Sequence, residues 1–224
     1  MKLLIREGPK HGYYPEPDKS YLVVSPTFVE LAKKMFSAHG VTIIEGGRVL
    51  GGFVGSKAEA QSWGSNKVQS WVKSLKILSE VARKQPQAAY VAVSKSLQNE
   101  WNYMQRIFPD CEDLFSPLKQ SLLEDFFPSL TSNPISDLEF NIFEKPTRMA
   151  GFGIRDPVTS SSYSFETSRS ATQILSISMI NGTLVDIASY ENNLNEVVKE
   201  RKKIKDEKEK FDTEDARKQT SKDQ

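Results

Sequence analysis

The chain has 224 residues, of which 38% are hydrophobic and 26% are charged, and its formal net charge is +1, which allows one sizeable core or two small ones. No apolar run approaches the roughly 20 residues of a membrane-spanning helix, and Leu3 to Ile5 is too short for a signal-peptide core of about 7–15 residues. The single cysteine, Cys111, excludes an intramolecular disulfide and a cysteine-cluster metal site, so we expect an intracellular protein of the cytoplasm or nucleus.

The charges are unevenly distributed along the chain. Lys and Arg outnumber Asp and Glu by 15 to 9 in residues 1–110, whereas acidic residues outnumber basic ones by 7 to 3 in 111–150 and by 5 to 2 in 151–198. Residues 199–224 carry 10 basic and 8 acidic side chains. A basic first half beside an acidic middle favours a protein with one polyanion-facing side, and ordinary surface variation is the alternative.

The first 56 residues predict short strands and one helix. Tyr21–Val24 is an apolar, β-branched run that predicts a buried strand. Ser25-Pro26 is typical of a helix start. Two further strands, 41–44 and 48–54, are joined by Glu45-Gly46-Gly47, which predicts a hairpin. The helix is expected to bury one apolar face, consisting of Phe28, Leu31, Ala32, Met35 and Phe36.

Apolar periodicity predicts three helices between residues 57 and 130, each with one buried stripe. Pro86 begins the second helix, Pro109 ends it, and Pro117 places the start of the third near Ser116. The stripes comprise, in chain order, Val68, Trp71, Val72, Leu75, Leu78 and Ala82; then Ala89, Val93, Leu97, Trp101 and Met104; then Leu114, Leu118, Leu122 and Phe126.

The last third of the chain predicts less regular structure. Residues 128–162 are rich in Pro, Ser, Thr and Gly and indicate mostly loop. A helix is predicted over 163–180, with Met179 among its inward residues. Lys199–Lys210 mixes charges of both signs at i, i+4 spacing, as in a solvated helix. Residues 212–224 have too few apolar side chains to pack and predict disorder.

No set of residues typical of a hydrolase or a phosphate-binding loop occurs in the sequence. His11 and His39 lie among turn residues, and no serine lies in a nucleophile elbow. Two-metal phosphoryl transfer needs carboxylates that hold ions about 3.5–4 Å apart, yet no Asp-Asp pair falls on a predicted strand. Glu112-Asp113 and Glu124-Asp125 fall on a helix, where adjacent positions face different directions. We therefore expect no catalytic residue and no metal site.

Several segments follow one another in an informative order: Gly8–Pro15, Asp18–Val24, the glycine-rich Gly46–Gly52, the amphipathic helices, and Arg148–Pro157. In this order they resemble the downstream half of a retroelement reverse transcriptase, from the last palm strands through the primer-grip hairpin and the thumb. In that family the catalytic carboxylates lie upstream, in a Tyr-x-Asp-Asp hairpin, and Met1 falls just past that position. The resemblance implies a nucleic-acid-handling fragment, with Mg²⁺ expected only for a complete polymerase.

The resemblance implies roles for four residues of the palm-like part. Lys19 corresponds to a family lysine near the incoming nucleotide, where a cation can neutralise charge on a leaving phosphate. Arg48, Gly51 and Gly52 correspond to the primer grip, where glycines let the backbone approach a nucleic-acid strand closely. The alternatives are a lysine beside an edge strand and ordinary turn glycines.

Three further residues belong to the first thumb-like helix. Lys73, Lys76 and Lys84 are expected to line one surface opposite the apolar stripe, where cations would contact phosphates without reading sequence. A face that only confers solubility is the alternative. The three tryptophans are expected to anchor helix packing rather than to stack on bases.

We expect an α+β fold in which a small palm-remnant sheet with one helix precedes a mainly α-helical thumb-like bundle and a charged C-terminal tail. The expected parts are a palm remnant with a primer-grip-like hairpin over 1–56, the bundle over 57–130, a loop-rich and helical extension over 131–198, and a partly disordered tail over 199–224. The expected function is that of a C-terminal fragment of an RNA-directed DNA polymerase, which binds template–primer backbone without sequence specificity.

The expected partners are an RNA–DNA or DNA duplex and the missing catalytic part of the polymerase, without a membrane. Two other functions stay open. One is a domesticated or relic helical module that binds a protein, and the other is a small helical enzyme with an unrecognised site.

Overall fold

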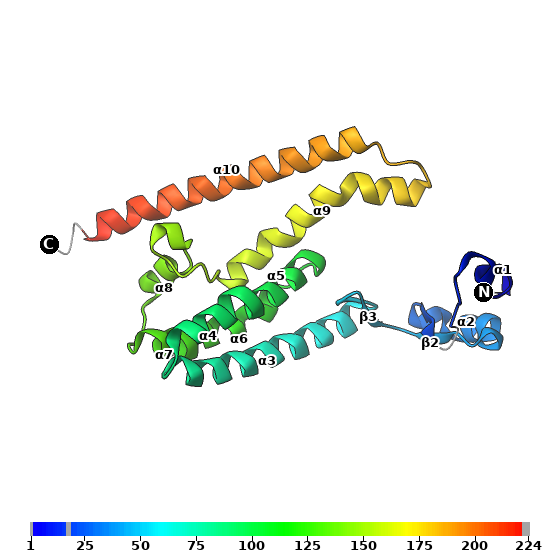
Figure 1. The fold of residues 1–224 in the computed structure, drawn as a ribbon, viewed down its shortest axis with the longest axis horizontal. Coiled ribbons are helices and arrows are strands. Elements are labelled where there is room, and N and C mark those ends of the chain that lie inside the picture. The colour runs from blue at the N-terminus through cyan, green and yellow to red at the C-terminus, as the bar shows by residue number, and fades with distance from the viewer. Residues whose placement is uncertain (1, 17–18, 221–224) are drawn as a thin grey trace.

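The computed structural model describes residues 2–16 and 19–220, and it is mainly helical with two small sheets (Figure 1). The α+β class expected from the sequence is confirmed. The helices are α1 (Lys2–Glu7), α2 (Val29–Phe36), α3 (Lys57–Ala82), α4 (Pro86–Ala92), α5 (Gln98–Ile107), α6 (Ser116–Ser121), α7 (Phe127–Thr131), α8 (Asp137–Phe143), α9 (Pro157–Asn181) and α10 (Ile187–Thr220). The strands are β1 (Tyr21–Val23), β2 (Thr42–Ile44), β3 (Gly47–Val49) and β4 (Gly52–Val54).

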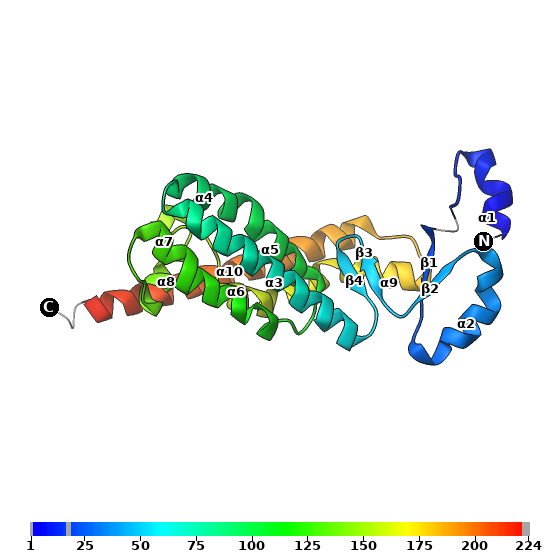
Figure 2. The same ribbon diagram turned by 90° about the horizontal axis from the view of Figure 1, so that it is seen from below.

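An N-terminal unit, made of the described residues up to Ile44, is set apart from the helical bundle in both views (Figures 1 and 2). Its sheet has two strands, β1 and β2, which pair in parallel, with Tyr21 opposite Thr42. The predicted hairpin between 41–44 and 48–54 is therefore wrong, because the first of these segments pairs with β1 instead.

The apolar face expected on α2 is largely uncovered. Ala32 is buried, but the other four residues of this face are exposed: Phe28, Leu31, Met35 and Phe36. Helical periodicity correctly predicts which side chains share a face. It does not show whether anything packs on that face, and α2 has only short neighbouring elements of its own unit to pack against.

The hairpin of the chain is formed by β3 and β4, around Leu50 and Gly51. Both residues have positive φ, 48° for Leu50 and 84° for Gly51. Two-residue turns of this kind match the twist of the strands that they join. The turn lies further along the chain than Glu45-Gly46-Gly47, where the sequence placed it, because a cluster of glycines does not by itself fix which pair adopts positive φ.

The helical bundle is built on α3. Ser56 caps this helix in a capping box with Glu59. The Trp71 ring lies in the core, stacked on Phe115 with 6.4 Å between ring centroids. Trp101 is buried as well, and Trp63 packs against the core. All members of the three predicted apolar stripes lie in this core or against it, which confirms those stripes and the packing role of the tryptophans.

Two π-helical segments, η5 (Val93–Leu97) and η7 (Leu122–Phe126), interrupt the second and third helices of the bundle. Apolar residues here recur every four positions, whereas an α-helix has 3.6 residues per turn, so the stripe would rotate by about 40° at each step. The i→i+5 hydrogen bonds of a π-helix place more residues in a turn. The π segments take up the drift, and the first and last residues of each are buried.

A polar junction joins the bundle to the start of α9. Asp156 caps α9 by accepting a hydrogen bond from the Val158 N–H at 2.9 Å, and its other carboxylate oxygen accepts one from Lys119 Nζ at 2.8 Å. Gln98 accepts a hydrogen bond from the Arg155 N–H and donates one to the Gly153 carbonyl. The segment Arg148–Pro157 therefore has a structural role in this fold.

The loop predicted for residues 128–162 is only partly correct. α8 and the first turns of α9 both fall inside this range. α8 begins with a capping box in which Ser136 and Glu139 hydrogen-bond to each other's backbone N–H groups, so the serine content of the segment supplies a helix cap as well as loop.

Beyond its first turns α9 leaves the bundle, and α10 returns antiparallel to it (Figure 1). The guanidinium of Arg201 lies 3.3 Å from the centroid of the Tyr163 ring, between the two helices. Met179, expected to face inward, is exposed. α10 continues to Thr220, so the predicted disorder is wrong for 212–220, where Lys, Glu, Arg and Ala favour a helix; residues 221–224 lie outside the described part. Among the described residues, no helix combines the length and apolar character needed to cross a membrane.

Candidate nucleic-acid interface

The β3–β4 hairpin is fixed to one end of the bundle. The Tyr103 hydroxyl of α5 donates a hydrogen bond to the Leu50 carbonyl at 2.7 Å. On β4, the Phe53 ring stacks on Trp63 with 5.8 Å between centroids. Trp63 in turn lies 6.2 Å from Phe108. The turn therefore projects from a rigid aromatic base, with the Leu50 side chain almost fully exposed at its tip.

The two glycines of the hairpin face α5. A Cβ atom at Gly51 would lie 3.1 Å from Cε1 of Tyr103, and one at Gly52 would lie 2.9 Å from Cδ1 of Ile107. The sequence predicted close approach to a nucleic-acid strand at these positions, whereas in the structure the space beside both glycines is occupied by α5. Arg48, opposite Phe53 in the ladder, is exposed and forms no ion pair with any described residue.

The α3 lysines are exposed, as the sequence predicted. Lys73 and Lys76 lie on the helix, but α3 ends at Ala82, so Lys84 lies in the following turn and not on the helix itself. None of the three forms an ion pair with a described residue. Glu80 lies between them on the helix surface and pairs with Arg83 at 3.5 Å.

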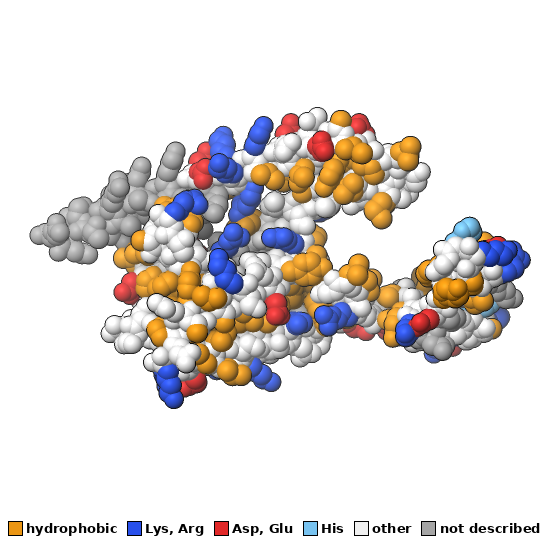
Figure 3. Space-filling model, in the orientation of Figure 1, with side chains coloured by type: hydrophobic (Ala, Val, Ile, Leu, Met, Phe, Trp, Pro, Cys, Tyr) orange, Lys and Arg blue, Asp and Glu red, His pale blue; other side chains and the backbone are white. Residues whose placement is uncertain are grey.

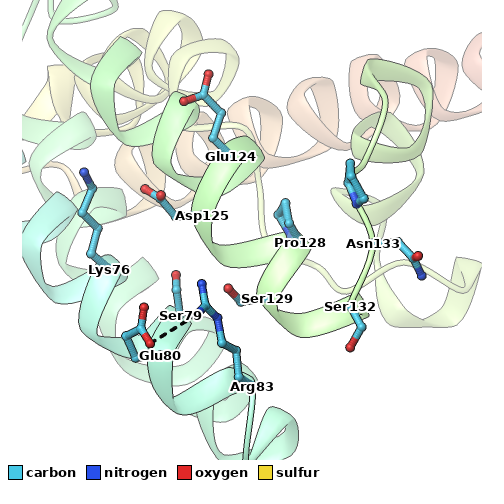
Figure 4. Close-up of a pocket in the computed structure, with 11 residues that line it drawn as sticks. Lys76, Ser79, Glu80, Arg83, Glu124, Asp125, Pro128, Ser129, Ser132 and Asn133 are labelled. Carbon is cyan, nitrogen blue, oxygen red and sulfur yellow. Dashed lines mark ion pairs between the residues drawn. The ribbon is translucent and has the colours of Figure 1, made fainter.

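Lys76 also lines an open pocket of about 490 Å³ between α3 and the η7–α7 region (Figure 4). Glu80 and Arg83 of α3 share this pocket with Glu124 and Asp125 of η7. The pocket is thus lined by three carboxylates and only two cations. Of the surface formed by Lys73, Lys76 and Lys84, the part at this pocket is therefore the less favourable for binding a phosphate. Sequence reasoning missed these acidic neighbours, because they come from a helix that tertiary packing alone brings beside α3.

Lys19 lies apart from the other candidate residues. It belongs to the N-terminal unit, immediately before β1, and its ammonium pairs with Glu16. Pro17 and Asp18, part of the motif that suggested a role for Lys19, lie outside the described residues. The structure thus brings Arg48, Gly51 and Gly52 together, places Lys73, Lys76 and Lys84 further along α3, and leaves Lys19 separate.

Among the groups with shifted pKa values, Cys111 and Asp156 are the buried ones, and neither shift indicates catalysis. Burial, together with neighbouring Glu112 and Asp110, raises the pKa of the Cys111 thiol to about 12, so the thiol stays protonated and unreactive. Burial also raises the pKa of Asp156, but hydrogen bonds from Lys119, Thr159 and the Val158 N–H outweigh it and leave the value lowered. Among the described residues, no group of three or more His, Cys, Asp or Glu side chains could hold a metal ion.

Comparison of the chain with protein-family models, with curated proteins and with solved structures found no match.

Proposed function

We propose that this chain is a C-terminal part of an RNA-directed DNA polymerase of the retroelement type, the part that follows the catalytic Asp-Asp strand. In this role the chain binds the template–primer backbone without sequence specificity. The bundle acts as the thumb and the β3–β4 hairpin as the primer grip.

The main observation in support of the proposal is that the β3–β4 hairpin packs against the bundle in a fixed position. Tyr103 and the stacked Phe53 and Trp63 rings hold the turn at the end of the helix that carries Lys73 and Lys76. A duplex held against the turn would run along exposed cations. Contacts of this kind are made to phosphates and fix position rather than read sequence.

The uncovered surface of the N-terminal unit favours a partner polypeptide as part of the same proposed function. Parallel sheets are normally covered on both faces, yet β1 and β2 form a two-stranded parallel sheet and most large apolar side chains of this unit are exposed. The catalytic part of the polymerase would supply further strands and cover these side chains. The carboxylates for Mg²⁺ would come from that part.

One observation favours the second function, a helical module that binds a protein. Apolar side chains are exposed on the N-terminal unit and on α9 and α10, whereas Lys76 of α3 shares its pocket with three acidic residues. Binding through apolar surface responds little to salt, whereas binding to phosphates weakens steeply as salt rises.

Salt dependence therefore tests the proposal. Fluorescence anisotropy of a labelled RNA–DNA duplex, titrated with the full chain over a salt series, should give log-affinity that falls linearly with log-salt. Each phosphate contact should contribute a slope of about −0.9 on duplex DNA. Absence of binding at low salt would refute the proposed function and leave the protein-binding module as the better account.

A further inference from the structure

The arm, which we define as residues 162–207 of α9, α10 and the turn between them, has almost no interior. Among those of its residues whose side chains the structure describes, only Ser178 is buried. The contacts between its two helices include the Arg201–Tyr163 stack and a hydrogen bond from Asn193 Nδ2 to the Ser170 carbonyl at 2.9 Å. Helices without a packed apolar face are marginally stable in water, so the arm needs a further surface to pack against.

Large apolar side chains gather where the arm turns, and Figure 3 shows hydrophobic side chains along it. Leu184 is 97% exposed, Ile180 is 83% exposed and Ile187 is 66% exposed. Further along α10, Val198 and Ile204 are about half exposed. Contiguous apolar surface of this kind marks an interaction site.

The charges of α10 indicate what covers this surface. Residues 186–196 carry Asp186, Glu191 and Glu196 and no Lys or Arg, whereas residues 197–205 carry five basic residues and one acidic one. The segment 186–205, at the start of α10, therefore has an acidic first half (186–196) and a basic second half (197–205), whereas residues 206–220 carry charges of both signs. A second copy of this segment, laid alongside in the opposite direction, would place each half of 186–205 against a half of opposite charge.

We propose that the partner of the arm is a second copy of this chain, with two α10 helices side by side and antiparallel. A twofold axis near Asn195 and Glu196 makes the contact self-complementary, because each copy supplies one acidic and one basic half. The same pairing sets Ile187 of one copy at the level of Ile204 of the other. The proposal does not depend on the polymerase-related function, and nucleic acid does not fit this surface, because the acidic half would repel phosphate.

Sedimentation velocity of the full chain tests this pairing. We expect a concentration-dependent dimer of twice 25.3 kDa. Substitution of two exposed residues, Ile180→Asp with Ile187→Asp, should weaken dimerisation by about tenfold or more. Because both side chains are exposed, the substitutions should leave the fold intact, which circular dichroism checks. Ile77→Asp, at an exposed apolar residue of α3, is the matched control and should leave the dimer unchanged.

Charge reversal distinguishes the antiparallel pairing from other contacts between copies. Glu191→Lys with Glu196→Lys makes both halves basic and should weaken the dimer by about tenfold or more. Adding Lys199→Glu and Lys202→Glu reverses both halves and should restore the dissociation constant to within about threefold of the wild-type value. The proposal would be overturned by a monomeric wild-type chain, or by a dimer that Glu191→Lys with Glu196→Lys does not weaken. It would also be overturned by a four-residue variant that stays monomeric.

Discussion

At the residue scale, the core of the bundle depends on a few large aromatic side chains, and Trp71 is one whose polar atom is also hydrogen-bonded. Trp71 is buried, stacks on Phe115 and lies 6.5 Å from Trp101, and its indole N–H donates to Glu100 at 2.9 Å. The apolar body therefore contributes packing, and the single polar atom is satisfied at the edge of the core.

Trp71→Ala should lower the free energy of unfolding by about 3–5 kcal/mol, since it removes a large buried side chain and leaves a cavity. Urea denaturation followed by circular dichroism measures the change. Glu100→Gln is the control, because it keeps an acceptor for the indole N–H and should cost much less. An unchanged midpoint for Trp71→Ala would show that the ring is not part of the core.

Asp156 gives a second prediction at this scale. Its pKa is lower in the folded chain than its ordinary value, so its stabilising contribution is present above about pH 4, the unfolded-state value, and is lost as the pH falls through the folded-state value. Asp156→Asn should cost about 1.5–3 kcal/mol near pH 7, in line with hydrogen bonds to a charged group. Urea midpoints of the wild-type and variant chains should converge as the pH is lowered below 4. A difference that stays constant with pH would contradict the role of the ionised carboxylate.

At the scale of elements, helices with strong apolar periodicity could be predicted and contacts between distant segments could not. The stripe Val68–Ala82 and the helix starts at Pro86 and Ser116 follow from local rules. β2 pairs with a strand some twenty residues earlier, and nothing local in 41–44 distinguishes that pairing from a hairpin. The four-residue apolar spacing of the second and third helices also contained a signal for the π segments, which the periodicity analysis did not use.

The candidate site likewise has some features that the sequence predicts and others that depend on tertiary packing. Exposure of Lys73 and Lys76 follows from their position opposite the stripe, whereas the acidic wall formed by Glu124 and Asp125 depends on tertiary packing. The glycines of the hairpin were predicted to approach a nucleic-acid strand, and in the structure they lie close to α5. Their neighbour, Tyr103, lies some fifty residues away in sequence and could not be identified from the hairpin alone.

The hairpin turn supplies a prediction for this scale. Gly51→Ala should destabilise the chain by about 1–2 kcal/mol, because φ is +84° there and an L side chain pays for the left-handed conformation. Gly51→Asn should cost less, since asparagine tolerates that conformation better. Thermal unfolding of the two variants shows which of them loses more stability. Equal melting temperatures for both variants and the wild type would contradict a rigid, glycine-dependent turn.

At the scale of the whole molecule, the exposed apolar surface of the N-terminal unit and of the arm is the most general feature. The bundle has a complete core, but the parts on either side of it do not. These exposed surfaces are the basis of both proposals, a catalytic part as the partner of the N-terminal unit and a second copy as the partner of the arm.

The proposed function also predicts that the chain alone does not polymerise. No strand in the described part of the chain carries a carboxylate, and phosphoryl transfer needs carboxylates placed to hold two ions. Purified chain given primer, template, Mg²⁺ and nucleotides should give no extended product on a gel. Template-dependent extension that persists after removal of contaminating polymerase would show that an active centre has been missed.

The most direct test of nucleic-acid binding by the bundle is the triple variant Lys73→Gln, Lys76→Gln and Lys84→Gln. Gln has a helix propensity close to that of Lys, so folding should be little disturbed. The control is Lys10→Gln, Lys33→Gln and Lys34→Gln, which removes the same charge from the N-terminal unit. Affinity for an RNA–DNA duplex is measured over a salt series for both variants and the wild type. We expect the α3 variant to bind more weakly and evenly across sequences, with a log-affinity against log-salt slope flatter by about two to three units. We expect the control to keep the wild-type slope. A wild-type chain that does not bind, or an α3 variant with an unchanged slope, would contradict the account.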